Sequence, residues 1–124
     1  MTAQLRFELP MSATINANSR EHWAVRANKV KNLRAVGANA ARQYGGRFNI
    51  AHLVITIGYP DKRRRDDHNY MPTFKALIDG VVDAGMLPDD SRDHLIGPDL
   101  RSTITGRTGL LVLDFLFTNQ EVPF

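Results

Sequence analysis

The stretch "FNIAHLVITIGYP", residues 48–60, has the clearest strand pattern in the sequence. It is rich in β-branched residues, which favour a pleated strand, and it stops at Pro60. We therefore predict a strand here and interpret the neighbouring segments outward from it.

The segments after this strand predict a loop, a helix and two further strands. Residues 61–71 are typical of a loop, and Pro72 suits the first turn of a helix because its missing N–H would be unpaired there. A helix over 72–84, ended by Gly85, would bury one apolar face, made of Phe74, Leu77, Ile78, Val81 and Val82. Beyond it we expect a turn at "MLPDDS" (86–91), a weakly patterned strand over 93–105, a turn at "RTG" (107–109) and a buried strand "LLVLDFLF" (110–117).

The segments before residue 48 predict one more strand and a long helix. "LRFEL", residues 5–9, alternates and ends at Pro10, and residues 11–21 are typical of a loop. A helix from His22 to Tyr44 follows, capped by Ser19, with Glu21 and His22 in its first turn and Gly45-Gly46 at its end. Its expected buried stripe has spacings of three and four: Trp23, Ala27, Val30, Leu33, Gly37 and Ala40.

The order β-α-β-α-β-β predicts a small single α+β domain over residues 1–124, with a mixed sheet and two main helices. A chain of 124 residues with 43% hydrophobic and 23% charged residues is typical of one soluble globular domain. The absence of cysteine excludes disulfides and thiolate metal sites. No apolar run is long enough to span a bilayer and "MTAQLRFELP" lacks a signal-peptide core, so we expect a cytoplasmic protein without a membrane partner.

The charge is divided unevenly along the chain. Residues 1–65 hold twelve basic and three acidic residues, a net +9, whereas residues 66–124 hold four basic and ten acidic residues, a net −6. A basic half indicates nucleic-acid binding and an acidic half a possible metal-binding locus. The boundary falls inside "KRRRDDHN", residues 62–69.

Candidate metal ligands lie beside this boundary. If residues 66–68 are extended, Asp66 and His68 point the same way and Asp67 the opposite way. "PDDS" supplies Asp89 and Asp90, but Asp90 can rejoin Asp66 only if the segment after the helix folds back toward the helix start. Carboxylate oxygens suit Mg²⁺.

Each of these features also has a purely structural interpretation. The arginine run and His68 suit a solvated loop, the "PDDS" carboxylates suit a turn, and Asn69 suits a helix N-cap. Lys75 has Asp79 four residues on as a surface partner, and the alternative role of Lys75 is to contact a phosphate.

The run "YPDKRRRDDHN…KALIDGVVDAGMLPDD" resembles the RusA-type Holliday junction resolvases, which are small dimeric Mg²⁺-dependent endonucleases often carried by phages. The family pattern is an arginine-rich lead into Asp-x-Asp-Asn, then a helix with Lys-Ala and an Asp, then Ala-Gly, a turn and Asp-Asp. The residues that follow this order are Arg63, Arg64, Arg65, Asp66, Asn69, Lys75, Asp79, Gly85, Asp89 and Asp90. About three extra residues separate Asn69 from Lys75, and "LPMSATINANSR" (9–20) resembles the family's Pro/Ser/Asn segment around Asn16 and Asn18.

The resemblance implies junction cleavage in DNA recombination and repair by paired phosphodiester hydrolysis in a homodimer. Asp66 and Asp90 would hold Mg²⁺, Lys75 would stabilise charge on the phosphate, and Asn69 would position the loop or a water. The expected DNA contacts are Asn18, Arg20, Arg26, Lys29, Lys62, Arg63, Arg64 and Arg65.

His68 occupies the place of the family's second Asp. Histidine is a poor Mg²⁺ ligand but suits Mn²⁺. Either His68 leaves a metal site with fewer carboxylates, which we favour, or Asp67 substitutes, or His68 acts as a base, or the site is inactive. The alternative functions are therefore a non-catalytic protein that binds branched DNA, and a metal nuclease that acts on other DNA structures.

Overall fold

The structure is a computed structural model that describes residues 1–104 and 109–120. Its four strands and two α-helices follow the predicted β-α-β-α-β-β order, which confirms the α+β fold class. The elements are β1 (Thr2–Pro10), η1 (Met11–Ala13), α1 (Trp23–Tyr44), β2 (Ala51–Tyr59), η2 (Asp67–Tyr70), α2 (Met71–Asp83), β3 (Leu95–Ile104) and β4 (Leu110–Asn119), where η marks a 3₁₀-helix. No helix in the described ranges is long and apolar enough to cross a membrane.

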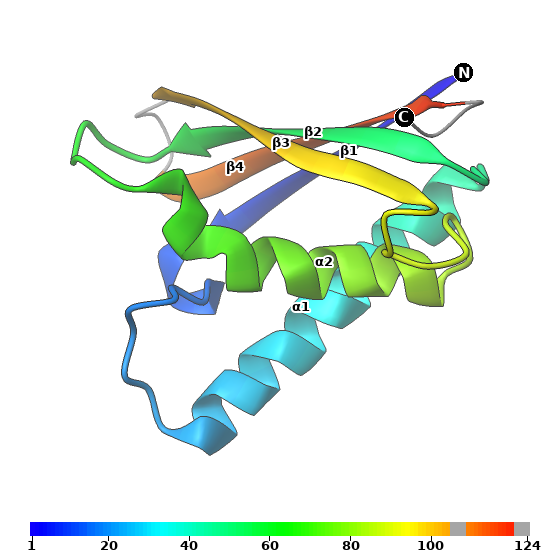
Figure 1. The fold of residues 1–124 in the computed structure, drawn as a ribbon. Helices are drawn as coiled ribbons and strands as arrows, with labels where there is room; N and C mark the ends of the chain where they lie inside the picture. Colours follow the sequence, from blue (N-terminus) through cyan, green and yellow to red (C-terminus); the bar gives the residue numbers. More distant parts are fainter. Residues whose placement is uncertain (105–108, 121–124) are drawn as a thin grey trace.

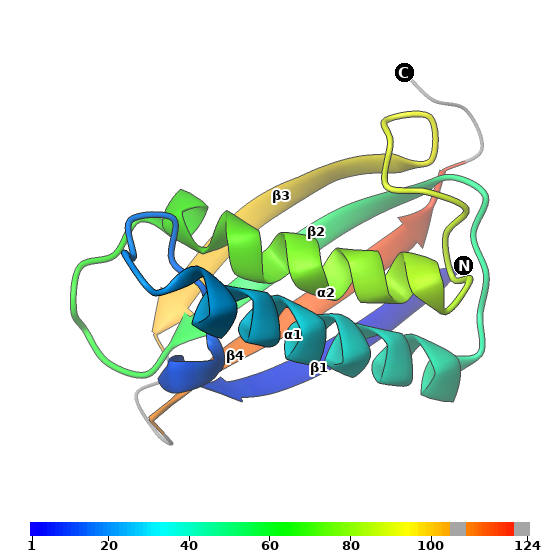
Figure 2. The same ribbon diagram turned by 90° about the horizontal axis from the view of Figure 1, so that it is seen from below.

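The strands form one mixed sheet in the order β1-β4-β2-β3. The strand β4 pairs antiparallel with both β1 and β2, whereas β3 pairs parallel with β2. A parallel pair needs a long crossover, and α2 is part of that connection. Both helices lie against the same face of the sheet (Figure 1) and run beside each other across it (Figure 2).

The core lies between the sheet and the helices. In β1 every second residue from Ala3 to Leu9 is buried, as expected for a strand with one face on the core. The central strand β4 buries Phe115 and Phe117 completely, and Val112, on its opposite face, is also buried. The predicted buried strand at 110–117 is therefore confirmed, although Leu116 is 39% exposed.

The two helices approach each other closely at a pair of glycines. A Cβ atom added at Gly37 would lie 2.2 Å from the carbonyl oxygen of Leu77, and one at Gly80 would lie 2.0 Å from that of Arg34. Real Cβ atoms do not come this close, so both positions require glycine. The guanidinium of Arg34 also pairs with Asp83 across this contact, with its second nitrogen 2.8 Å from the carboxylate.

Two predictions about the start of α1 are wrong. The N-cap is His22, not Ser19, and His22 Nδ1 accepts a hydrogen bond from the Ala24 N–H at 3.1 Å. Trp23 and Ala27 were expected in the buried stripe, but both are exposed because the first half of α1 extends away from the sheet (Figure 1). Burial begins only where the helix reaches the sheet and α2, at Leu33, Gly37, Ala38 and Ala41.

The second helix agrees with the sequence more closely. It begins one residue before Pro72, ends as predicted before Gly85 (φ 85°), and buries Phe74, Leu77, Ile78 and Val81, with Val82 partly buried. The weakly patterned segment forms β3, whose pairing with β2 shifts register between His52 and Val54. Most of the predicted 107–109 turn lies outside the described residues.

Candidate active site

The arginine-rich loop after β2 is folded around Asp61. Its carboxylate accepts hydrogen bonds from the Arg63 N–H at 2.9 Å and from the Arg65 guanidinium at 2.8 Å. The Arg65 bond holds the pKa of Asp61 below its ordinary value. The Arg65 side chain is only 9% exposed and lies 5.2 Å from the centroid of the Tyr59 ring. Arg65 is thus a structural residue of the loop, while Arg63 and Arg64 are exposed.

The two carboxylates that follow the arginines have different partners. Asp66 caps η2, because its Oδ1 accepts a hydrogen bond from the His68 N–H at 3.0 Å. Asp67 Oδ1 accepts a hydrogen bond from the Tyr59 hydroxyl at 2.6 Å. Burial, together with this bond, raises the pKa of Tyr59 above its ordinary value. The condition that residues 66–68 are extended is not met, since a 3₁₀-helix begins at Asp67.

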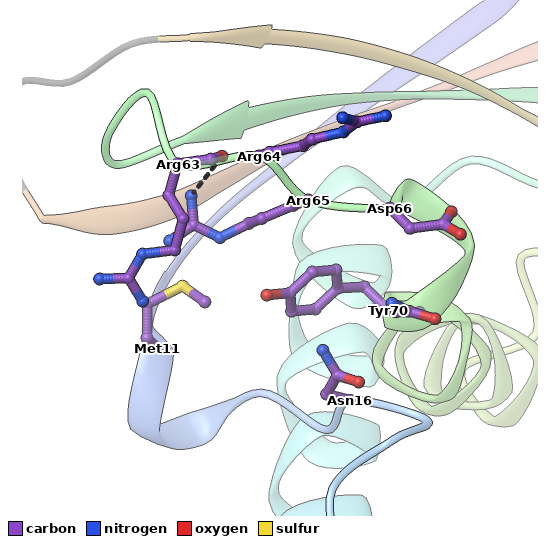
Figure 3. Close-up of a pocket in the computed structure, with 8 residues that line it drawn as sticks. Met11, Asn16, Arg63, Arg64, Arg65, Asp66 and Tyr70 are labelled. Atoms are coloured by element: carbon purple, nitrogen blue, oxygen red, sulfur yellow. Dashed lines mark hydrogen bonds between the residues drawn. The ribbon is translucent and has the colours of Figure 1, made fainter.

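A pocket of about 370 Å³ opens beside this loop (Figure 3). Its lining combines cationic, amide and apolar groups, from Met11, Asn16, Arg63, Arg64, Arg65, Asp66, Asn69 and Tyr70. A second hollow, of about 460 Å³, shares Arg64, Arg65 and Asp66 with it and adds Asp67, His68 and Ser102. Asp66 therefore lies between two hollows with arginine on the rim of each.

The segment from Thr14 to Asn18 is tied to the start of α2, and this brings Asn16 into the pocket. The Thr73 hydroxyl is completely buried; it accepts a hydrogen bond from the Ile15 N–H at 2.8 Å and donates one to the Ile15 carbonyl at 2.9 Å. The Ala17 N–H donates to the Asn69 carbonyl at 2.7 Å. Asn16 lines the pocket, whereas Asn18 is exposed and its N–H donates to the Asn16 side chain at 2.8 Å.

A second polar cluster lies along α2. The Lys75 ammonium contacts Asp79 Oδ1 at 2.7 Å and also contacts Asp90 Oδ2. These two bonds raise the pKa of Lys75, and Lys75 lowers the pKa of Asp90. The segment after α2 therefore folds back far enough for Asp90 to reach the helix. Asp89 has the structural role expected of a turn carboxylate, since its Oδ1 accepts the Asp90 N–H at 2.8 Å.

The structure brings together only some of the candidate metal ligands. Asp90 shares Lys75 with Asp79, while no hydrogen bond or ion pair in the described ranges joins Asp90 to Asp66 or His68. Within those same ranges, no three histidine or acidic side chains are close enough together to hold a metal ion. The pairing of Asp66 with Asp90 stays a prediction. Asp79 is the candidate ligand that sequence reasoning missed, although its spacing from Lys75 was a usable signal.

The predicted DNA contacts divide into two groups. Lys29 is occupied, because its ammonium lies 2.6 Å from Glu21 and donates to the Thr14 carbonyl at 3.1 Å. Arg65 is occupied by Asp61. The remaining predicted cations have no acidic partner in the part of the chain that the structure describes; they are Arg20, Arg26, Lys62, Arg63 and Arg64.

Comparison of the chain with protein-family models and with curated proteins found no match.

Proposed function

We propose that the chain is a metal-dependent endodeoxyribonuclease that resolves four-way DNA junctions as a homodimer. The observation that carries this proposal is the convergence of Asp79 and Asp90, from separate segments, on the single cation of Lys75. Lys75 and Asp79 of this cluster lie on α2, which follows the arginine-rich loop and η2 in the chain. The arginines that would bind phosphates and the carboxylates that would bind a metal ion are therefore near each other in the sequence.

The donor chemistry of this cluster fits a hard divalent cation. The Asp79 and Asp90 oxygens are both within bonding distance of one ammonium, so they already share a cation position. Carboxylate oxygens are the ligands that Mg²⁺ and Mn²⁺ prefer. The lowered pKa of Asp90 keeps its carboxylate ionised at neutral pH.

A bound Mg²⁺ or Mn²⁺ would supply a water of lowered pKa and would offset negative charge on the scissile phosphate. Lys75, released from its carboxylates, would then donate hydrogen bonds to phosphate oxygens as charge develops there. Arg63 and Arg64 would neutralise backbone phosphates, a contribution that weakens as salt rises. His68, on the hollow beside Asp66, would be placed to accept a proton or to bind Mn²⁺.

The homodimer follows from the substrate. A four-way junction has approximate two-fold symmetry and needs two opposed cuts, and a C2 dimer supplies two identical sites in matching orientation.

A gel assay on a labelled synthetic four-way junction, with Mg²⁺, Mn²⁺ and EDTA lanes and linear duplex as competitor, tests this function. We expect paired, symmetric nicks that require metal. The variant Asp90→Asn should lose cleavage while keeping or tightening junction binding, because it removes a metal ligand and a repulsive charge. Asp93→Asn is the matched control, since Asp93 is exposed in the same segment and makes no ion pair in the described ranges. Normal cutting by Asp90→Asn would refute the site assignment.

A branched-DNA-binding protein without nuclease activity is the second candidate. It is favoured by Lys75, whose ammonium pairs with both Asp79 and Asp90 and so offsets the charge of these carboxylates. This candidate predicts junction binding that is the same in Mg²⁺ and in EDTA, and no nicks with either metal.

A further inference from the structure

Trp23 is the most exposed large apolar side chain of the described chain, with 76% of its surface accessible, and it is the chain's single tryptophan. Tryptophan is normally largely buried, because its indole removes more apolar surface from water than any other side chain. The exposed valines of the same helix, Val25 and Val36, are 48% and 39% exposed. An indole with this exposure therefore indicates a binding surface.

The indole is held beside a second aromatic ring. The His22 and Trp23 ring centroids are 5.5 Å apart, with an angle of 30° between the planes. The His22 ring is itself fixed, because its Nδ1 accepts the Ala24 N–H that caps α1. Two flat side chains thus stand on the first turn of α1, on the part of the helix that projects away from the sheet (Figure 1).

The charge around these rings is positive. Arg20 precedes them and Arg26 follows one turn later, and neither has an acidic partner in residues 1–104 or 109–120. The first turn of α1 contains no acidic residue. The nearby acid, Glu21, is occupied by Lys29 at 2.6 Å. A ligand that lies on the rings therefore meets free cations, which favours an anion with a flat apolar face.

The segment 14–18 connects this surface with the arginine-rich pocket. The segment between them is anchored by the Ala17–Asn69 hydrogen bond, and it contributes Asn16 to the pocket lining. Both ribbon views place the start of α1 at the same end of the molecule as the loop after β2 (Figures 1 and 2). A strand whose phosphates lie on Arg63 and Arg64 can therefore continue toward Trp23.

We propose that Trp23, supported by His22, is a stacking platform for an unpaired base of bound DNA, with Arg20 and Arg26 holding the adjacent phosphates. Stacking on an aromatic side chain tolerates any base, but it needs a base face that is free of a duplex neighbour. A symmetric contact with a second copy is disfavoured, because it would bring the same arginines of both copies together. This inference rests on the DNA-binding part of the proposed function and is independent of cleavage.

Intrinsic fluorescence tests the platform directly, because Trp23 is the single indole of the chain. The full-length protein is titrated in EDTA, which prevents metal-dependent cutting, with three ligands: oligothymidine, a four-way junction with unpaired thymines at its centre, and a closed duplex without free ends. We expect the first two DNAs to quench the emission at saturation, whereas the closed duplex leaves it almost unchanged. Binding is followed in parallel by the anisotropy of a labelled DNA.

Variants separate stacking from a structural role. Trp23→Ala should bind oligothymidine about 5- to 150-fold more weakly, the range typical for loss of one base–aromatic stack. Trp23→Phe should recover most of that loss because it keeps a ring, and Val36→Ala, an exposed position later on the same helix, should bind like the parent protein. All of these positions are exposed, so the variants should fold.

The results of these experiments test the stacking platform and the proposed nuclease separately. Bound DNA with unchanged Trp23 emission, or Trp23→Ala binding like the parent protein, would overturn the inference and leave the proposed nuclease untouched. Quenching without cleavage in either metal would support the platform and refute the nuclease. A protein that binds no DNA would refute both. Emission that falls with protein concentration alone would overturn the platform, because the indole would then lie between copies of the chain.

Discussion

The buried hydroxyl of Thr73 should be worth several kcal/mol, and the structure allows that value to be worked out. The variant Thr73→Val keeps the branched shape but removes the hydroxyl that bonds both the N–H and the carbonyl of Ile15. Both Ile15 and Thr73 are completely buried, so water does not replace these bonds in the folded chain. Two buried backbone groups without partners cost about 1–3 kcal/mol each, which gives about 2–6 kcal/mol in total.

That loss is large against a typical domain stability of about 5–15 kcal/mol. The matched variant is Thr73→Ser, which keeps both hydrogen bonds and loses one buried methyl group, at a cost of about 1 kcal/mol. Urea unfolding followed by circular dichroism measures both free energies. We expect Thr73→Val to be less stable than Thr73→Ser by at least about 1 kcal/mol, although valine is the more apolar residue.

The same variant should also release the segment that carries Asn16. Thr73 anchors this segment beside the pocket, and in the variant the Ala17–Asn69 and Lys29–Thr14 hydrogen bonds would still hold it at its two ends. Residues 14–18 should lose amide-exchange protection in Thr73→Val but keep it in Thr73→Ser. Equal stability and equal protection in the two variants would refute the reasoning.

Five further predictions concern the helix contact and the candidate site. Gly80→Ala should destabilise the protein by about 1–3 kcal/mol in urea unfolding, despite the better helix propensity of alanine, because its Cβ would lie 2.0 Å from a carbonyl oxygen of α1. The stabilising contribution of Asp90, whose pKa is lowered by Lys75, should be present above its ordinary pKa of 3.8 and be lost as the pH falls through the lowered value. Unfolding as a function of pH should therefore show a larger acid-side loss of stability in the parent protein than in Asp90→Asn, in which Asp61 and Asp83, whose pKa values are also lowered, still titrate. Because the pKa of Lys75 is raised, its contribution to the free energy of unfolding should be complete below its ordinary pKa of 10.5 and be lost as the pH rises through the raised value. The variant Lys75→Met should lack this contribution in the same measurement. If Arg64 contacts one phosphate, Arg64→Gln should reduce the slope of log affinity against log salt by about 0.9, and an unchanged slope would place Arg64 off the DNA. His68→Asp, which restores the acidic residue of the resembled family, should raise Mg²⁺-supported cleavage, and no gain would show that the imidazole does not stand in for a ligand.

Periodicity predicted the elements of this fold well because it reports burial directly. The helix over 72–84 was predicted from its apolar spacing and the strand within 48–60 from its β-branched residues, and both are present. The prediction failed at the start of α1, where Trp23 has the spacing of a core residue but lies beyond the part of the helix that packs on the sheet and α2. A periodic pattern shows which residues share a face, and it does not show where the partner surface ends.

The candidate site was predictable in its residue types and less so in its pairings. The arginine run, Asp66, Lys75 and Asp90 are all visible in the sequence, and the Lys75–Asp79 pair follows from its spacing of four residues. The sequence did not predict that Arg65 pairs with Asp61 and Lys29 with Glu21. Counting charges along the chain does not show which basic side chains form ion pairs within the fold.

The sequence by itself determined the order of elements, the α+β class and the concentration of charge at the junction of residues 61–70. These properties depend on local propensity and on apolar periodicity, which are written in consecutive residues. The tertiary structure alone decided that Asp90 returns to α2, that Thr73 anchors the Asn16 segment, and that Trp23 stays in solvent. Each of these depends on contacts between distant segments, because only the packing of helices on the sheet sets which side chains meet and which are left exposed.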